Sequence, residues 1–456
     1  MAGVDANAVV FVGRARRRFS SQQITISLCV LIVLAGLLVA SPFLVLRALL
    51  LVNLIYAAGF FALRFVAITA VVLSPQRQAP PRAEPVELPR VTLLCPLYRE
   101  ANSVSRLIDS ILRTDYPHDR LEVLILLEED DDETETGIRS LPPQIRVIRV
   151  PPGGPRTKPN ALNHGLLEAR GEIIGIYDAE DRPEPDQLTK VVNALAAGAP
   201  RLACVQARLN YYNRSDSIIT RLFCLEYALQ FDWFLRGLDL LDLPLPLGGT
   251  SNFVTREALL GVGGWDAHNV TEDADLGFRL YAAGFQTRTV DSTTFEEATD
   301  TPRRWVHQRS RWLKGYLQTF LVHLRSTLSW RAAIVLHFAL GGVVLNALIN
   351  PWMWIAFLAW TLTGAEALRP IFAGLERPLM MAFFAGNIGT AWLFIMAPTV
   401  REWFNLAPSG LLLPVYWVLQ SMAAYKALYE FCVRPFYWDK TEHSEGEDSL
   451  REAAHA

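Results

Sequence analysis

The chain has 456 residues, of which 51% are hydrophobic and 20% are charged, and its formal net charge is −3. This composition allows one soluble domain together with several membrane spans, and it excludes nucleic acid as the expected partner, because binding to a phosphate backbone needs concentrated Lys and Arg. The five cysteines form no CxxC pair and have no nearby His at metal-binding spacing, which argues against a disulfide framework or a zinc site.

The first feature along the chain is an apolar stretch over residues 24–73. Its length suits two membrane spans of about 20 residues each and is too great for a signal peptide. Four arginines precede it, Arg14, Arg16, Arg17 and Arg18. Under the positive-inside rule this cluster places the start of the chain in the cytoplasm. We therefore expect residues 1–75 to form a cytoplasmic segment followed by two transmembrane helices.

Residues 76–330 combine mixed charge with short apolar runs, as in a globular domain, and two preceding spans would place this domain in the cytoplasm. Four runs rich in β-branched residues indicate buried strands, at 91–95, 123–127, 147–150 and 173–177. Helical patterns separate these runs, which predicts an α/β domain with a largely parallel sheet. Ligands of such domains gather at the carboxyl ends of the strands, so polar clusters that follow strands are the first candidates for function.

Polar clusters follow the first two strands. Tyr98 and Glu100 come after the first strand, and Glu128 and Glu129 open a run of five acids after the second. Such a run is usually a solvated loop or the start of a helix, although its position also suits hydrogen bonds to a nucleotide base or ribose. Lys158 precedes a helical pattern, where a cation and free backbone amides can meet a phosphate, or where it is an ordinary surface lysine.

Asp178 and Glu180 follow the fourth strand. Carboxylates at i and i+2 after a buried strand can hold a divalent cation through oxygen ligands, and a diphosphate would complete the coordination. The metal would then neutralise charge on a departing nucleoside diphosphate. The competing interpretation is a simple turn or helix cap, which Pro183 and Pro185 favour.

Thr271, Glu272 and Asp273 precede an amphipathic helical pattern. They are either a helix cap with favourable acids in the first turn, or they include the general base that deprotonates an acceptor hydroxyl. A displacement that inverts an anomeric carbon needs one such base and no covalent intermediate.

Gln308-Arg309-Ser310-Arg311-Trp312 lies just ahead of the second apolar block. The arginine fork matches phosphate oxygens, and an indole face stacks on a sugar ring. Arg and Trp are also common at membrane surfaces, so this segment alone would equally fit an interfacial anchor.

The second apolar block predicts about four transmembrane helices within residues 331–432. Their expected positions are 332–349, 351–364, 379–399 and 410–432. The second is short for a full crossing, so it is either a kinked or interior helix or a separate span joined to the first by a tight hairpin at Asn350-Pro351. Residues 433–456 are expected to form a cytoplasmic, interfacial tail without a catalytic role, which requires an even number of spans.

The ordered set Asp178-Ala179-Glu180, Thr271-Glu272-Asp273 and Gln308-Arg309-Ser310-Arg311-Trp312 resembles the processive family 2 glycosyltransferases. That family includes the cellulose, hyaluronan, chitin and poly-N-acetylglucosamine synthases. The resemblance covers the soluble domain and the flanking apolar segments. It implies an α/β GT-A (nucleotide-diphospho-sugar transferase) cytoplasmic domain inserted between α-helical transmembrane segments of the inner (plasma) membrane.

The resemblance also implies roles for individual residues. Asp178 and Glu180 would bind Mg²⁺ or Mn²⁺, and Asp273, beside Glu272, would be the catalytic base. The nucleotide-sugar would be bound by Tyr98, Glu100, Glu128, Glu129, Lys158, Asp178, Gln308 and Arg311. The acceptor would meet Trp312, Gly249, Thr250 and Ser251. Glu180, Glu128 and Glu129 depart from the family pattern, because each replaces an Asp with a side chain one methylene longer.

We therefore expect an inverting, metal-dependent enzyme that transfers sugar from a UDP-sugar to a growing β-linked polysaccharide and moves the polymer across the membrane. Asn346, Asn350 and Asn387, within or beside apolar segments, are candidates for a hydrated polymer path or for helix packing. One alternative keeps the chemistry but uses a membrane lipid as the acceptor. A distant alternative is an inactive membrane scaffold or transporter component. The sugar, the linkage and any accessory secretion subunit stay open.

Overall fold

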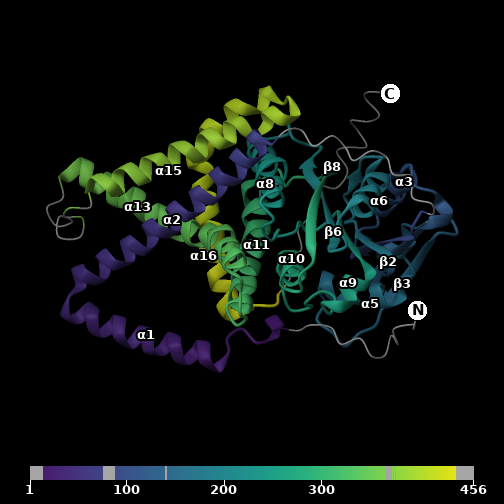
Figure 1. Cartoon of the computed structure of the whole chain (residues 1–456), viewed down its shortest axis with the longest axis horizontal. Helices are drawn as coiled ribbons and strands as arrows, with labels where there is room; N and C mark the ends of the chain where they lie inside the picture. The colour runs from purple at the N-terminus through teal and green to yellow at the C-terminus, as the bar shows by residue number, and fades with distance from the viewer. Residues whose placement is uncertain are drawn as a thin grey trace.

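The computed structural model describes residues 14–74, 88–138, 141–364, 372, 374 and 376–437. An α/β domain lies beside a group of long apolar helices that come from both ends of the chain (Figure 1). This is the expected insertion of a soluble domain between apolar segments. The expected boundary at residues 75 and 76 and most of the tail 433–456 lie outside the described residues.

A mixed eight-stranded sheet forms the centre of the described domain, in the order β3-β2-β1-β4-β7-β6-β8-β5. Its strands are β1 (Val91–Leu97), β2 (Leu121–Glu128), β3 (Ile145–Val150), β4 (Ile173–Ile176), β5 (Arg182–Pro183), β6 (Leu202–Tyr211), β7 (Asn252–Thr255) and β8 (Gln286–Glu296). Strands β1 to β4 pair in parallel, as the apolar runs predict. Strand β7 is antiparallel to both β4 and β6, and β5 is antiparallel to β8. The carboxyl ends of β1, β2 and β4 therefore share one edge.

Helices cover both faces of the parallel half. Leu93 and Leu94 are neighbours in β1 and fully buried, but they enter different cores, because successive side chains of a strand point to opposite faces. Leu93 packs in the core that holds α3 (Val104–Leu112), and Leu94 in the core that holds α5 (Lys158–Glu168). This two-sided burial explains why the strands read as continuous apolar runs.

The remaining helices of the domain lie between the sheet and the apolar helices or cover the outer part of the sheet. They are α4 (Asp132–Thr136), α6 (Gln187–Ala197), α7 (Ile218–Tyr227), the π-helical segment η4 (Ala228–Phe234), α8 (Leu235–Leu240), α9 (Arg256–Gly261), α10 (Glu272–Ala282) and α11 (Pro302–His323). Helix α11, which carries the Gln-Arg-Ser-Arg-Trp segment, runs along the boundary between the sheet and the apolar helices (Figure 1).

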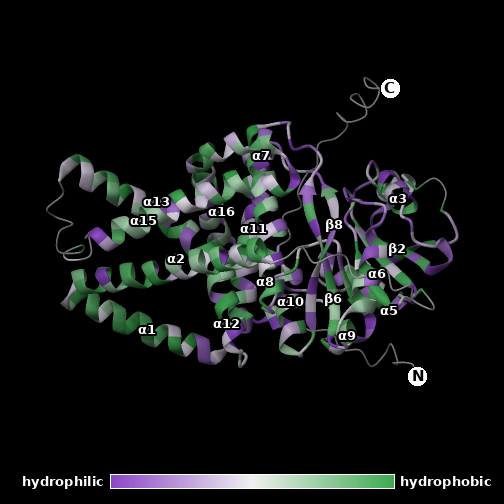
Figure 2. Cartoon of the chain, turned by 45° about the horizontal axis from the view of Figure 1, so that its top comes forward, coloured by the Kyte–Doolittle hydropathy of each residue, from purple (hydrophilic) through white to green (hydrophobic). Residues whose placement is uncertain are grey.

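Five helices among the described residues are long and apolar enough to cross a membrane. They are α1 (Ser21–Ala40), α2 (Pro42–Leu73), the continuous helix Trp330–Thr363, a helix that includes α15 (Glu376–Met396), and one that includes α16 (Leu413–Val433). The continuous helix comprises α12 (Trp330–Val335), η5 (Leu336–Gly341) and α13 (Gly342–Thr363). Figure 2 shows hydrophobic residues all round α1 and α2, as expected of helices that face lipid.

The expected hairpin at Asn350-Pro351 is wrong, because α13 continues through Pro351. Three long helices therefore replace the four segments expected in residues 331–432. Proline removes one helical hydrogen bond, and within an apolar bundle neighbouring helices can satisfy the freed carbonyls. Here the Tyr425 hydroxyl of α16 donates to the Leu348 carbonyl at 2.6 Å, next to the Ala347 carbonyl that the proline leaves without its helical donor.

Helix α16 lies lengthwise against α11 (Figure 1). Near its start, the Tyr416 hydroxyl accepts a hydrogen bond from the Trp305 indole at 3.0 Å. Near its end, Glu430 forms a buried ion pair with Lys314 at 3.1 Å. Both ends of α16 thus contact the α/β domain, which holds this helix along the domain boundary.

Two further contacts fix the α/β domain to the apolar helices. Arg401, in the turn η7 (Ala397–Arg401) after α15, binds both carboxylate oxygens of buried Asp232, at 2.7 and 2.8 Å. At the second contact, the backbone of α2 approaches α8 so closely that a methyl group on Gly237 would overlap the Ala67 carbonyl. These contacts enclose the space between the domain and the helices.

Candidate active site

A cavity of about 580 Å³ lies between the edge of the sheet and the apolar helices. Its walls come from the carboxyl ends of β1, β2 and β4, from the loop before β7, from the start of α10 and from one face of α11. The cavity also reaches α2, η4, η5 and α13. One hollow therefore joins the edge where an α/β sheet binds ligands to the helices of the membrane region.

Asp178 and Lys158 form a close ion pair on the cavity wall. The Lys158 ammonium lies 2.5 and 2.6 Å from the two Asp178 carboxylate oxygens and donates to the Gly249 carbonyl at 2.8 Å. Burial alone would lower the pKa of Lys158, but the charges of Asp178 and Glu272 outweigh it and hold that pKa above its usual value. Lys158 is thus a permanent cation at the place where the sequence predicts a phosphate contact.

Asp181, the third acid of the cluster after β4, supports the turn. It is buried, and its Oδ2 accepts a hydrogen bond from the Asp178 backbone amide at 2.7 Å and another from the Thr250 hydroxyl. Burial first, and then the charges of Asp178 and Glu180, raise the pKa of Asp181 well above its ordinary value. The turn that the prolines indicated is therefore present, and it presents Asp178 and Glu180 to the cavity.

Asp273 lies on the same side of the cavity as Lys158. Its Oδ1 accepts from the Ala274 amide at 2.6 Å, and a methyl group on Gly249 would lie 3.2 Å from its Oδ2 and 3.9 Å from Lys158 Nζ. Burial raises the pKa of both Asp273 and Glu272, and the Asp273 charge raises that of Glu272 further. Asp273 and Glu272 are thus neighbouring buried carboxyls on the cavity wall, and Asp273 holds the position that the sequence predicts for the base.

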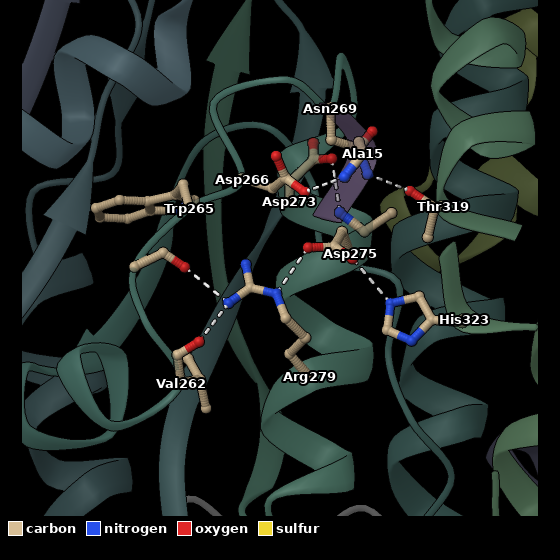
Figure 3. A network of polar contacts seen from close by, with 12 residues as sticks. Ala15, Val262, Trp265, Asp266, Asn269, Asp273, Asp275, Arg279, Thr319 and His323 are labelled. Atoms are coloured by element: carbon tan, nitrogen blue, oxygen red, sulfur yellow. Dashed lines mark hydrogen bonds and ion pairs between the residues drawn. The ribbon is translucent and has the colours of Figure 1, made fainter. Parts of the chain in front are cut away.

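A polar network holds the first turns of α10 in place (Figure 3). Asp275 binds Arg279 Nε at 2.7 Å and His323 Nε2 of α11 at 2.8 Å. Burial would raise the pKa of Asp275, but these two partners outweigh it and lower that pKa below its ordinary value. In the preceding loop, Asn269 donates to Thr319 of α11 at 2.8 Å. Because α10 and its loop are tied to α11, Asp273 has a fixed position.

Gln308, Arg311 and Trp312 all line the cavity, as the motif predicts. They share one face of α11, since residues three and four apart lie together on a helix. Gln308 Oε1 is buried and accepts no hydrogen bond from the described residues. The Trp312 ring packs against Tyr227, with the ring centroids 6.1 Å apart.

Arg309, the remaining basic residue of the segment, has a structural role. Its guanidinium binds Glu226 at 2.5 Å and stacks on Trp312 and Trp305, with centroid distances of 4.6 and 4.9 Å. The Tyr416 hydroxyl donates to the same Glu226 oxygen at 2.5 Å. This cluster orients Trp312 and joins α7, α11 and α16.

The residues predicted after the first two strands divide between two hollows. Tyr98, Glu100 and Glu128 line the main cavity, whereas Glu129 is exposed and borders an adjoining hollow of about 400 Å³. Burial is the main cause of a raised pKa at Glu128, and Arg156, which borders both hollows, opposes it. Glu129 is therefore set apart from the other predicted residues.

Of the three acceptor-binding residues predicted in the loop before β7, two line the cavity. Gly249 and Thr250 line the cavity, but the Thr250 hydroxyl is already bonded to Asp181 and to the Ile176 carbonyl. Ser251 lies behind this wall, fully buried, with its hydroxyl 2.6 Å from Thr294 Oγ1. The missing side chain of Gly249 leaves room beside Asp273.

Several cavity residues did not emerge from the sequence. Glu296 ends β8, a strand that the apolar-run pattern does not reveal, and burial together with Asp181, Glu180 and Asp178 raises its pKa well above the ordinary value. Phe436 and Tyr437, in the tail expected to be only interfacial, also line the cavity. Lys314 holds this segment by donating to the Tyr437 carbonyl at 2.8 Å.

The donor set at the acidic turn is suited to a hard divalent cation. Asp178 and Glu180 offer carboxylate oxygens on the cavity wall, and buried Glu296 lies close enough for their charges to act on it. Among the described residues, no three His, Cys, Asp or Glu side chains are already arranged as a metal cage. The protein residues therefore fit a metal that shares its coordination with a ligand such as a diphosphate.

Comparisons with known proteins agree with this geometry. Residues 173–405, just over half of the chain, match the family model "Glycosyl transferase family group 2". The chain is 31% identical over 273 residues to a beta-monoglucosyldiacylglycerol synthase of Synechocystis, covering 58% of this chain and 56% of that protein. It is 27% identical to a probable glycosyltransferase of Bacillus subtilis, over 50% of this chain and 56% of that protein.

A cellulose synthase catalytic subunit of Pseudomonas fluorescens is 28% identical, over 69% of this chain and 44% of that protein. The chain spans about half the length of the curated relatives that it matches. Among solved structures, a mannosyltransferase from Pyrobaculum calidifontis in complex with GDP-Man and Mn²⁺ superimposes with a TM-score of 0.57 at 22% identity, covering 84% of this chain and 99% of that one. This likeness confirms the GT-A-like fold. The chain therefore belongs to glycosyl transferase family group 2 and is a glycosyltransferase.

Proposed function

We propose that this enzyme transfers a sugar from a UDP-sugar to a lipid acceptor in the membrane, with inversion at the anomeric carbon. The observation that carries the proposal is the shape of the cavity, which extends from Asp178 and Asp273 to the apolar helices. Its far part, here called the membrane arm, is lined by Phe231, Phe234, Ala339, Leu340 and Val343.

The membrane arm suits acyl chains better than a sugar polymer. Its lining side chains are aromatic or aliphatic, and contact with lipid chains removes such surface from water at about 25 cal/mol per Å². A growing polysaccharide needs a hydrated path, but Asn346, Asn350 and Asn387 do not line the cavity. The likeness to a monoglucosyldiacylglycerol synthase also supports the lipid acceptor. We therefore place it ahead of the polysaccharide that we first expected.

At the donor end of the cavity, Asp178 and Glu180 would hold Mg²⁺ or Mn²⁺ together with the diphosphate of the donor. That cation supplies positive charge that stabilises the departing UDP. Lys158 and Arg311 add permanent positive charge for phosphate oxygens. Tyr98, Glu100 and Glu128 lie where the nucleoside would bind, at the ends of β1 and β2.

Asp273 then acts as the general base. It accepts the proton of the acceptor hydroxyl while the hydroxyl oxygen forms a bond to the anomeric carbon and the bond from that carbon to the diphosphate breaks. Gly249 leaves space beside the carboxylate, and Trp312 offers an indole face to the sugar. Glu272, with its higher pKa, is a neighbour of the base and not its substitute.

The same geometry supports a membrane topology. If α16 rests on α11 at the membrane surface, four crossings remain: α1, α2, the helix Trp330–Thr363 and the helix that includes α15. Four crossings return the chain to the side of the α/β domain. With Arg14, Arg16, Arg17 and Arg18 inside, residues 76–330 form the cytoplasmic catalytic domain.

Product analysis tests this function. The purified enzyme in nanodiscs that contain diacylglycerol, phosphatidylglycerol and phosphatidylinositol is given radiolabelled UDP-glucose, UDP-N-acetylglucosamine or UDP-galactose with Mg²⁺ or Mn²⁺. We expect label in the organic extract, on a lipid that carries one or a few sugars, with Asp273→Asn as the inactive control. Label only in long, alcohol-insoluble polymer would contradict the proposal and restore the polysaccharide synthase.

A further inference from the structure

Arg64 is a cation in an unusual place. It belongs to α2, one of the apolar helices, and it lines the cavity beside the membrane arm. Its guanidinium carbon lies over the rings of Phe60 and Phe234, 4.4 and 4.8 Å from their centroids. Among the described residues it has no hydrogen bond and no ion pair. An ionisable residue within an apolar helix is expensive to keep, which makes it a candidate for function.

The surrounding charges do not neutralise Arg64. Glu226 lines the same cavity and attracts it, but the Glu226 carboxylate is already bound by Arg309 at 2.5 Å and by the Tyr416 hydroxyl at 2.5 Å. Two arginines and one glutamate leave this part of the cavity with a net charge of about +1. Such a site favours an anion, and a guanidinium fork matches the oxygens of a phosphate.

Arg64 lines the same cavity as the reacting end and the membrane arm. Tyr316 of α11 lines the same cavity, and the charges of both Asp273 and Arg64 act on it. Phe234, over which Arg64 lies, lines this cavity together with apolar residues of η5 and α13. An acceptor in this cavity would therefore place its hydroxyl near Asp273, an anionic group near Arg64 and its chains in the membrane arm.

We propose that Arg64 binds the phosphate of the acceptor, and that the acceptor is an anionic phospholipid whose headgroup carries the accepting hydroxyl. The proposal rests on the proposed function and narrows it, because a neutral diacylglycerol has no group to pair with Arg64. The chemistry is unchanged: the headgroup hydroxyl gives its proton to Asp273 and bonds to the anomeric carbon as UDP leaves.

The test compares lipids with identical acyl chains in nonionic mixed micelles. The anionic acceptors are phosphatidylglycerol and phosphatidylinositol, the neutral one is diacylglycerol, and soluble glycerophosphoglycerol is the headgroup without chains. Apparent kcat and KM are measured for the wild type, Arg64→Gln and Arg64→Lys. Arg47→Gln is the matched control, because Arg47 is the other arginine of α2 and does not line the cavity.

We expect the wild type to prefer at least one anionic lipid over diacylglycerol. Arg64→Gln should raise KM for that lipid by about tenfold or more, as for the loss of a charged hydrogen bond, and should change the value for diacylglycerol much less. Arg64→Lys should keep part of the preference, and Arg47→Gln all of it. A purely structural role of Arg64 would lower transfer to both lipids by the same factor.

Three results would overturn the inference. The first is a wild type that uses diacylglycerol as efficiently as the anionic lipids. This result would leave the lipid-acceptor function intact. The second is an equal loss for all lipids in Arg64→Gln. The third is equally good use of soluble glycerophosphoglycerol, which would assign Arg64 to a soluble phosphate. A long polymer without any lipid product would instead contradict the proposed function itself.

Discussion

The two ends of the cavity balance their charges differently. At the donor end, Lys158 is paired with Asp178 and bonded to Gly249, so the protein itself balances these charges. Beside the membrane arm, Arg64 lies over aromatic rings, and the Glu226 carboxylate is bound to Arg309. We propose that the donor end is organised for the transfer chemistry, whereas the membrane end selects the acceptor.

The largest expected effect is at the base. Asp273→Asn keeps the size of the side chain and removes its ability to accept the proton, so kcat should fall by about 10³-fold or more. Binding of UDP, measured by calorimetry, should change little. Glu272→Gln is the neighbouring comparison and should retain far more activity than Asp273→Asn. If the two variants were equally impaired, the assignment of the base to Asp273 would be wrong.

The junction between the two regions comes next. Arg401→Ala removes the bidentate partner of buried Asp232 and leaves it the longer ion pair with Arg208 at 3.8 Å, so the loss should approach the cost of about 3–5 kcal/mol for breaking a buried pair. Thermal unfolding in detergent should show a large fall in Tm. Arg149→Ala, at a partly exposed ion pair on the far strand β3, should change Tm little. Equal effects of the two substitutions would mean that the junction is not stabilised by this pair.

A smaller effect is expected where α11 meets the loop before α10. A methyl group on Gly315 would overlap the Thr271 side chain, so Gly315→Ala must displace that loop and should destabilise by about 1–3 kcal/mol while lowering kcat. Gly261→Ala is the control, since a methyl group there meets nothing within 4 Å. Unchanged kcat in Gly315→Ala would show that Asp273 does not depend on this contact.

The smallest effect is a shift in pH dependence. Burial raises the pKa of Asp273 above the ordinary value near 4, and the base works only when ionised. Activity should therefore fall as pH decreases through this raised pKa, with the acid limb of kcat at about pH 6. Donor binding is also measured at each pH. This measurement distinguishes a loss of activity caused by protonation of Asp273 from one caused by loss of the metal. A limb near pH 4 or below would contradict a buried base.

The same contrast governs what the sequence reveals. Asp178, Lys158, Asp273 and Gln308 were identified because each has a local signature, at the end of a strand or at the start or on one face of a helix. The parallel strands were predicted for a similar reason, since burial on both faces leaves a continuous apolar run.

The membrane end has no such local signature. In the sequence, Arg64 is a single charged residue within an apolar helix. Its side chain lines the cavity only because of how α2 is rotated and packed. Glu296 was missed because β8 lacks an apolar run. The helix through Pro351 was missed because Asn350-Pro351 also favours a turn, and only the packing of α13 against α16, where the Tyr425 hydroxyl bonds to the Leu348 carbonyl, shows the continuous helix. These features depend on contacts between distant segments, which local patterns do not encode.

The central claim is that the membrane arm holds the chains of a lipid acceptor. Val343→Trp would fill this arm, and Ile355→Trp, on an exposed part of α13, would add the same ring outside the cavity. The decisive measurement is the ratio of transfer to long-chain and short-chain forms of the same lipid. We predict that Val343→Trp lowers this ratio by about tenfold while Ile355→Trp leaves it unchanged. An unchanged ratio in Val343→Trp would contradict the account.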